Sequence, residues 1–283
     1  MQQGVEKLRV ELLVIDPQND FCVDGAPLCV PGAWDDMERI ANMINRIGGK
    51  LDDIHVTLDT HHRLDVAHSL MWKDAKGDMP EPLKTVITHQ DVDSGVWRPV
   101  NPRWLHGVHL DRGGQPIWGL WDYTKALQDN GRYPLVIWPE HCLVSTPGTN
   151  VVEPLAKALY DWEGQIAMVD FVLKGSNMWT EHYSAVQADV PDPEDHTTQL
   201  NTRLITTLQE VDLILLAGEA LNFCVASTVT DIADNFGEDN IKKLCLLEDA
   251  TNVVPGFDAL TDAFMNNLIG RGMQISTTDK ILA

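Results

Sequence analysis

The sequence predicts a three-layer α/β/α fold whose central sheet is mainly parallel and Rossmann-like in topology. Short runs rich in Val, Ile and Leu alternate with longer stretches whose apolar residues recur every three or four positions. The short runs are apolar almost throughout, as in strands that are buried on both faces. Polar residues follow several of these runs directly, at the edge where an open parallel sheet places its ligands.

The predicted elements alternate along most of the chain. Strands are expected at residues 8–15, 54–58, 135–138, 166–173, 211–217 and 241–247. Helices are expected at residues 31–47, 149–160, 197–209, 222–233 and 257–268. The glycines at positions 48, 49 and 270 are expected to end helices, and Asn222 is expected to act as an N-cap.

Residues 72–133 interrupt this alternation. The stretch contains five tryptophans, several prolines and a Gly113-Gly114 turn. We interpret it as a Trp-rich insertion within a single domain that spans residues 1–283. Insertions at strand ends commonly cover a site or contact another subunit. Tryptophans that simply pack the insertion are the alternative.

Composition narrows the class of protein. A chain of 283 residues, 44% of them hydrophobic, can bury one large core. A formal charge of −21 argues against nucleic acid or an anionic membrane as partner. The chain opens without a signal-peptide pattern and has no run of about 18 apolar residues. Five cysteines without a CxxC pair fit reduced thiols, so a cytoplasmic protein is expected.

A carboxyl group ends the first predicted strand. Asp16 follows an apolar run directly, at a sheet edge suited to ligands. Loss of water there is expected to raise the pKa of Asp16 and make it a better base, unless a cation lies close. Taken alone, an Asp at such a place is more often a helix cap or a turn residue.

Candidate metal ligands follow two further strands. Asp59 and His61 stand two residues apart and project to one side of an extended segment, and His141 follows another apolar run. One carboxylate and two imidazoles suit a divalent metal and leave positions open for water or substrate. Zn is the expected ion, with Fe and Mn as alternatives. A polar turn at Asp59 and His61, or a zinc–thiolate site through Cys142, are the competing interpretations.

A lysine ends another strongly apolar strand. The charged ammonium group of Lys174 needs a carboxylate partner, and Asp16 is the predicted one. This ion pair would keep Asp16 ionised and Lys174 protonated. A lysine that extends along the sheet edge into water is the alternative.

One cysteine opens a predicted helix. Residues 216–225 are typical of a strand, a tight turn and a helix start, with Cys224 in the first turn. The helix dipole is expected to lower the pKa of this thiol, and the backbone N–H groups of Ala220 and Cys224 can face a developing oxyanion. An inert buried cysteine is the alternative.

These pieces, in this order, resemble the motifs of isochorismatase-like cysteine hydrolases, specifically the nicotinamidase (pyrazinamidase) branch. The likeness spans nearly the whole chain. The motifs are Asp16-Pro17-Gln18-Asn19-Asp20-Phe21, Asp59-Thr60-His61, Trp138-Pro139-Glu140-His141-Cys142, Lys174-Gly175 with the later His182-Tyr183-Ser184, and Ala220-Leu221-Asn222-Phe223-Cys224.

The resemblance implies a hydrolase of linear amides that converts nicotinamide to nicotinate through a thioester. It implies a catalytic triad of Asp16, Lys174 and Cys224, an oxyanion site at Ala220 and Cys224, a metal site of Asp59, His61 and His141, and substrate walls at Phe21 and Trp138. A small amide is the implied partner, and a homo-oligomer is expected. A sibling amidase for a ureido or carbamoyl compound and a non-catalytic binding protein are the alternatives.

Two departures from the family pattern concern the nucleophile segment. The usual A-T-D-x-C reads Ala220-Leu221-Asn222-Phe223-Cys224, and Glu219 replaces a small apolar residue before an expected cis peptide. His68 resembles an additional histidine near the metal of some members. Its spacing is offset, so the predicted ligand set omits it.

Overall fold

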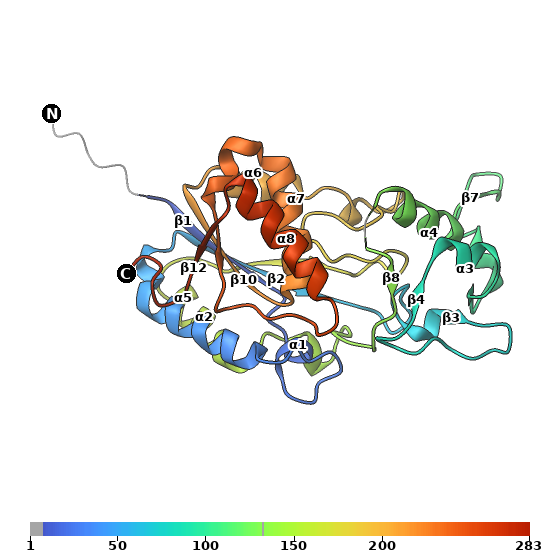
Figure 1. Ribbon diagram of the computed structural model, residues 1–283, viewed down its shortest axis with the longest axis horizontal. Helices are drawn as coiled ribbons and strands as arrows, with labels where there is room; N and C mark the ends of the chain where they lie inside the picture. The colour runs from blue at the N-terminus through green and yellow to red at the C-terminus, as the bar shows by residue number, and fades with distance from the viewer. Residues whose placement is uncertain (1–7, 132) are drawn as a thin grey trace.

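The computed structural model describes residues 8–131 and 133–283, and its centre is a six-stranded parallel sheet (Figure 1). Counted along the chain, the strands lie in the order 3-2-1-4-5-6, the classic doubly wound arrangement. They are β1 (Val10–Ile15), β2 (Asp53–Asp59), β9 (Asp170–Lys174), β10 (Leu213–Gly218), β11 (Leu244–Leu247) and β12 (Gln274–Ser276). The strand order reverses between β1 and β10, so the site is expected at their carboxyl ends.

Helices cover both faces of the sheet, which confirms the predicted three-layer fold (Figure 1). On one face α2 (Ala33–Ile47) packs beside α5 (Glu153–Glu163). On the other lie α6 (Thr202–Gln209), α7 (Ala226–Phe236) and α8 (Asp258–Arg271). Among the described residues, none of the helices combines the length and the apolar character needed to cross a bilayer.

One strand prediction is wrong in part, and one strand of the sheet was not predicted. The apolar run 135–138 does not join the main sheet, because β8 (Leu135–Val136) pairs antiparallel with the short strand β4 (Val86–Ile87). The run is buried all the same, so its composition could not show which strand it joins. β12 was not predicted because it is short and only partly buried, and so lacks a clear apolar pattern.

The predicted helix boundaries also need correction. α2 ends at Ile47 as predicted, although Gly48 after it has a right-handed backbone. Gly270 lies inside α8, which ends instead before the left-handed Gly272 (φ 111°). Asn222 is not an N-cap, since it lies within the π-turn η6 (Leu221–Val225) that precedes α7. Its side chain instead pairs with the backbone of Val254 in both directions.

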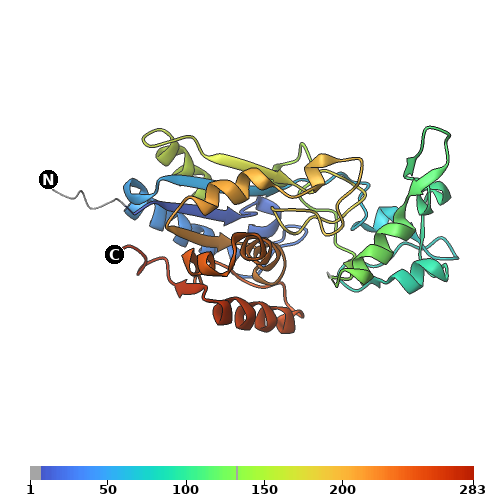
Figure 2. The same ribbon diagram turned by 90° about the horizontal axis from the view of Figure 1, so that it is seen from above.

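The described residues from 72 to 131 form short elements that lie beyond one end of the main sheet (Figure 2). Trp72 is fully buried and donates its indole N–H to the carbonyl oxygen of Val66 at 2.7 Å. Trp104 and Trp118 are partly buried against the core. The elements are β3 (Trp72–Lys73), β4, α3 (His89–Asp93), β5 (Arg98–Pro99), β6 (His109–Leu110), β7 (Pro116–Trp118) and α4 (Leu120–Asp129).

A buried histidine links the edge of the sheet to its centre. His55 Nδ1 lies 2.9 Å from Asp170 Oδ2 on β9, and His55 Nε2 lies 3.1 Å from Glu11 Oε2 on β1. Burial disfavours the charged ring, but the two carboxylates outweigh burial and raise the pKa of His55. This group therefore stabilises the fold fully below its unfolded pKa, and the contribution is lost as pH rises through the folded pKa.

We expect His55→Gln to lower the free energy of unfolding by about 3 kcal/mol at about pH 6, because it removes the cation between two carboxylates. At about pH 9 the cost should be smaller, since a smaller fraction of the wild-type rings is then charged. Urea unfolding at both pH values measures the difference, with the exposed His196→Gln as control. An equal cost at both pH values would contradict this account.

Candidate active site

The three predicted catalytic side chains meet at the carboxyl ends of the central strands. Asp16 follows β1, Lys174 ends β9, and Cys224 lies in the π-turn after β10. Their exposed fractions are 0%, 2% and 6%. Lys174 Nζ lies 2.9 Å from Asp16 Oδ2 and 3.7 Å from Cys224 Sγ. An ammonium group therefore contacts both the carboxyl group and the thiol.

Asp16 is held in place by the neighbouring strand. Its backbone is left-handed (φ 46°), which costs a non-glycine residue of order 1 kcal/mol. Thr57 on β2 compensates, because its hydroxyl donates to Asp16 Oδ1 at 2.5 Å and accepts from the Asp16 backbone N–H at 3.0 Å. The carboxyl group is thus fixed before any substrate binds.

The turn after β10 places the thiol. β10 ends at Gly218 (φ 115°), where a Cβ atom would lie 2.0 Å from the carbonyl oxygen of Ile15, so only glycine fits. The Glu219-Ala220 peptide that follows is cis, as expected from the sequence. The Ala220 carbonyl oxygen accepts bonds from Phe223 and Val225. The Ala220 N–H finds no acceptor among the described residues.

The electrostatics of the thiol differ from the expectation. Burial raises the pKa of Cys224 well above its usual value, and the charge of Lys174 offsets this only in part. The prediction that the helix dipole lowers this pKa is therefore wrong, because burial outweighs it. Burial alone would lower the pKa of Lys174, but Asp16, Asp59 and Cys224 raise it. Lys174 stays an ammonium group, and Cys224 is a thiol at rest.

Asp16 is the base within reach of that thiol. Burial raises its pKa, while the charge of Lys174 and the hydroxyl of Thr57 lower it in part. The sequence predicted this direction only if no cation lay close, and the structure shows that burial outweighs the charge of Lys174 at 2.9 Å. A carboxyl group with a raised pKa is better matched to accept a thiol proton than an ordinary aspartate.

Asp59, His61 and His141 form a second cluster beside the triad. One ligand atom from each lies within 4.8 Å of the others. Asp59 Oδ2 is 2.9 Å from His61 Nε2 and 3.6 Å from His141 Nε2. Lys174 Nζ also lies 3.1 Å from Asp59 Oδ1, a contact that the sequence did not predict. The two clusters therefore share one ammonium group.

The donor set fits a divalent metal such as zinc. His61 Nδ1 donates to Asp65 Oδ2 at 3.0 Å, and His141 Nδ1 donates to the carbonyl oxygen of Pro139 at 2.8 Å. These bonds fix the proton on Nδ1 and leave each Nε2 for an ion, as in many metal sites. Within the described residues the cluster includes no cysteine, so nothing supports the zinc–thiolate alternative through Cys142.

His68 lies beside this cluster although the predicted ligand set omitted it. It is fully buried, and both ring nitrogens lack a hydrogen-bond partner among the described residues. Its ring centroid is 5.2 Å from that of His61 and 5.5 Å from that of His141. Burial lowers the pKa of His68 to about 4, so the ring is neutral. A neutral, unpaired imidazole is available to an ion or to its water.

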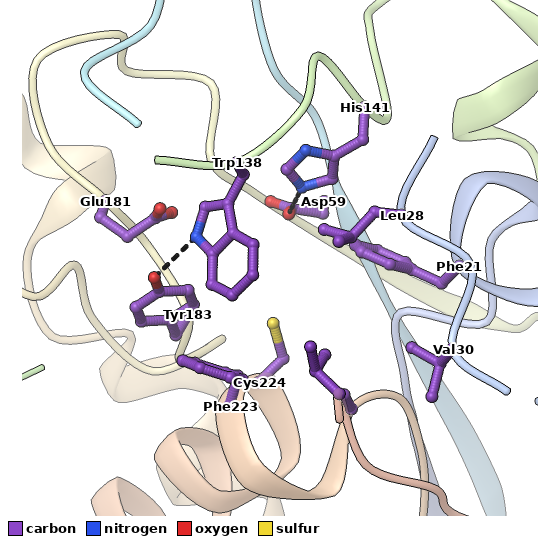
Figure 3. A pocket seen from close by; sticks show the side chains of 12 residues that line it. Phe21, Leu28, Val30, Asp59, Trp138, His141, Glu181, Tyr183, Phe223 and Cys224 are labelled. Atoms are coloured by element: carbon purple, nitrogen blue, oxygen red, sulfur yellow. Dashed lines mark hydrogen bonds and ion pairs between the residues drawn. The ribbon is translucent and has the colours of Figure 1, made fainter. Parts of the chain in front are cut away.

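A pocket opens onto both clusters (Figure 3). Phe21 and Trp138, the predicted walls, line it on opposite sides, and Phe21 meets the His141 ring edge-on at 5.4 Å. The Trp138 indole N–H donates to the Tyr183 hydroxyl at 2.8 Å. Besides these aromatic walls, Asp59, His141, Glu181 and Cys224 present polar or reactive side chains to the pocket. The lining comprises Phe21, Leu28, Val30, Asp59, Trp138, His141, Glu181, Tyr183, Ala220, Phe223, Cys224 and Val254.

Comparison with known proteins agrees with the motifs. The nicotinamidase of Escherichia coli (strain K12) is 27% identical over 223 residues, which cover 78% of this chain and 74% of that protein. The solved structure of the yeast nicotinamidase superposes with a TM-score of 0.62 at 19% identity, over 94% of this chain and 98% of that one. The pyrazinamidase of Pyrococcus horikoshii, solved in complex with zinc, superposes with a TM-score of 0.54 at 18% identity. The match covers 95% of this chain and 99% of that one.

No protein-family model matches the chain. The structural comparisons nevertheless show the isochorismatase-like α/β fold, in which a parallel sheet lies between two layers of helices. The similarity in sequence to two nicotinamidases confirms the resemblance that the motifs indicate.

Proposed function

We propose that this isochorismatase-like protein is a metal-dependent nicotinamidase, which hydrolyses nicotinamide to nicotinate and ammonia through a thioester on Cys224. The observation that carries the proposal is the contact of Lys174 with both Asp16 and Cys224 at the base of the pocket. The similarity to nicotinamidases supports the same reaction.

Acylation begins when Asp16 accepts the proton of the Cys224 thiol. The sulfur attacks the carboxamide carbon, a C–S bond forms, and the oxyanion accepts hydrogen bonds from the backbone N–H groups of Ala220 and Cys224. Asp16 then passes the proton to the amide nitrogen, the C–N bond breaks, and ammonia leaves. Lys174 remains charged throughout and stabilises the carboxylate and the attacking sulfur.

Deacylation repeats the proton transfers with water. Asp16 accepts a proton from the water as its oxygen attacks the thioester carbon. The C–S bond breaks, the proton returns to the Cys224 sulfur, and the free acid is released. The same carboxyl group thus serves as base in both halves of the reaction.

Asp59, His61 and His141 would hold a divalent ion, for which we propose zinc. Such an ion supplies a positive charge that binds and orients the ring nitrogen of the substrate. Phe21 and Trp138 would contact the flat faces of the ring, and their apolar surfaces would exclude water from the thioester.

An amide panel tests the proposal. Ammonia release is measured for nicotinamide, other aromatic carboxamides, and ureido and carbamoyl compounds, with and without a chelator. We expect nicotinamide to give a higher kcat/KM than any ureido or carbamoyl compound, and we expect the chelator to suppress turnover. Preference for a ureido or carbamoyl compound would point to a sibling amidase, and no release from any compound would favour a binding protein.

Removing one metal ligand gives a readout that does not depend on turnover. We expect His61→Ala to lower bound zinc, measured by elemental analysis after dialysis, and to weaken metal affinity by about 10-fold to 100-fold or more. His62→Ala is the matched control, because this neighbouring histidine is exposed. Full zinc occupancy in His61→Ala would contradict the assignment.

We further propose one domain with residues 72–133 as an insertion, acting as a cytoplasmic homo-oligomer without a nucleic-acid or membrane partner. The five cysteines are free, as a reducing compartment requires. β9 is an edge strand, and the apolar side chains of Phe171 and Leu173 on it and Met168 before it are exposed. Such an edge favours pairing with a second copy. Light scattering measures the oligomeric state.

A further inference from the structure

One polar group of the pocket has no part in the proposed reaction. In the proposed complex the ring nitrogen faces the metal ligands, the carbonyl oxygen faces the amides of Ala220 and Cys224, and the amide nitrogen leaves. Of the non-aromatic polar side chains that line the pocket, Asp59 and Cys224 are accounted for. Glu181 is not.

The carboxyl group of Glu181 is buried and half satisfied. Its exposed fraction is 5%. Oε1 accepts a bond from the His182 backbone N–H at 3.0 Å, while Oε2 has no partner among the described residues. An unpaired buried oxygen costs about 1–3 kcal/mol. The fold therefore keeps an unfavourable group in the wall of its active-site pocket.

The backbone of Glu181 is anchored on both sides, and the bond from the His182 N–H holds its side chain at Oε1. Its N–H donates to the Tyr123 hydroxyl at 3.2 Å, and its carbonyl oxygen accepts from the Asp189 N–H at 2.9 Å. Figure 3 shows the carboxyl group on the side of Trp138 and Tyr183, opposite the wall of Phe21, Leu28 and Val30.

The surroundings suit recognition by hydrogen bonding. Burial raises the pKa of Glu181 to about 8. Near neutral pH the group is thus a carboxylic acid that both donates and accepts hydrogen bonds. The neighbouring lining residues Trp138, Tyr183 and Phe223 present mostly aromatic surface, and the Tyr183 hydroxyl already accepts the Trp138 indole N–H. Glu181 Oε2 is therefore the oxygen on this side that lacks a partner among the described residues.

We propose that Glu181 is a specificity-determining residue whose unpartnered oxygen accepts a hydrogen bond from an amino group on the substrate ring. The site then favours amino-substituted pyridine carboxamides over unsubstituted nicotinamide. This inference rests on the proposed function, because it names the substrate class of the same site. The preference arises because the substituted ring pairs an oxygen that nicotinamide leaves unpaired.

The test compares nicotinamide with its ring-amino isomers in the wild type, Glu181→Gln and Glu181→Leu. We expect at least one isomer to exceed nicotinamide in kcat/KM by about 10-fold, the equivalent of one hydrogen bond. Glu181→Leu should abolish that preference. Its kcat/KM for nicotinamide should stay within about 3-fold of the wild-type value, since only the substituted ring loses a hydrogen-bond partner. Glu181→Gln, which still carries an acceptor oxygen, should retain most of it.

Tyr123→Phe is the matched control, because it removes the hydroxyl that holds the Glu181 backbone but keeps the carboxyl group. This variant should retain the preference. The inference is overturned if no isomer exceeds nicotinamide, or if Glu181→Leu lowers all substrates equally.

Binding of the product acids by calorimetry separates this inference from the proposed function. If no compound releases ammonia, the proposed function fails, but the affinity ratio of aminonicotinate to nicotinate still tests Glu181. We expect that ratio to fall about 10-fold in Glu181→Leu. An unchanged ratio would overturn the inference.

Discussion

Replacing Cys224 by alanine is expected to lower kcat for nicotinamide by at least about 10⁴-fold. The variant loses the only atom that forms a covalent bond to the substrate in the proposed mechanism. Asp16 and Lys174 keep their 2.9 Å contact, so the pocket should still bind substrate. Ammonia release under saturating nicotinamide measures the effect, and product binding by calorimetry shows that the site is intact.

The matched control is Cys245→Ala. Cys245 is also a buried, free thiol, but it lies on β11 and does not line the pocket. The kcat of this variant for nicotinamide should stay within a few-fold of the wild-type value, because the substitution changes only packing. A Cys224→Ala enzyme that keeps more than about a tenth of wild-type kcat would rule out the covalent step.

Asp16→Asn should give the second largest effect, a loss of about 10² to 10⁴ in kcat. The amide has nearly the same shape but cannot accept the thiol proton. Since burial raises the pKa of Cys224, little thiolate forms without that base. Steady-state ammonia release measures the loss, with the exposed Asp24→Asn as control.

The pH profile supplies an independent signature of Asp16. Burial raises its pKa above the usual value near 3.8, so the carboxylate is lost as pH falls through this raised pKa. Wild-type kcat/KM should therefore fall on the acid side at a pH above about 4, and Asp16→Asn should lack this acid limb. An unchanged acid limb in the variant would assign it to another group.

Local patterns were enough to predict most of the fold. Apolar runs followed by a polar residue or glycine marked β1, β2, β9 and β10. β9 is nevertheless an edge strand with Phe171 and Leu173 exposed, so its apolar run does not reflect burial on both faces. The run 135–138 has the same composition but belongs to a separate two-stranded pairing. Pairing is set by tertiary packing, which a run of four residues does not encode.

The candidate site was predicted where its residues terminate strands. Asp16, Lys174 and Cys224 converge because parallel strands end at one edge of the sheet. His68 and Glu181 lie instead in irregular segments between elements, where no period fixes the direction of a side chain. His68 resembles a histidine that lies near the metal in some family members. It was left out of the predicted ligand set because its spacing in the sequence differs from theirs.

The prediction for the Cys224 pKa was wrong because it depends on tertiary packing, which the local sequence does not show. A helix start is visible in the sequence, and it favours a thiolate. Complete burial is a property of the packed structure, and here its effect is larger. The link from Lys174 to Asp59 is likewise tertiary, since it depends on the register of β2 against β9.

The thioester itself can be observed directly. Enzyme and nicotinamide are mixed, quenched in acid within one turnover and digested for peptide mass spectrometry. We predict a transient nicotinoyl group on the peptide that contains Cys224, formed together with the first equivalent of ammonia. Ammonia release without any enzyme-bound acyl group, or an acyl group on another residue, would contradict the account.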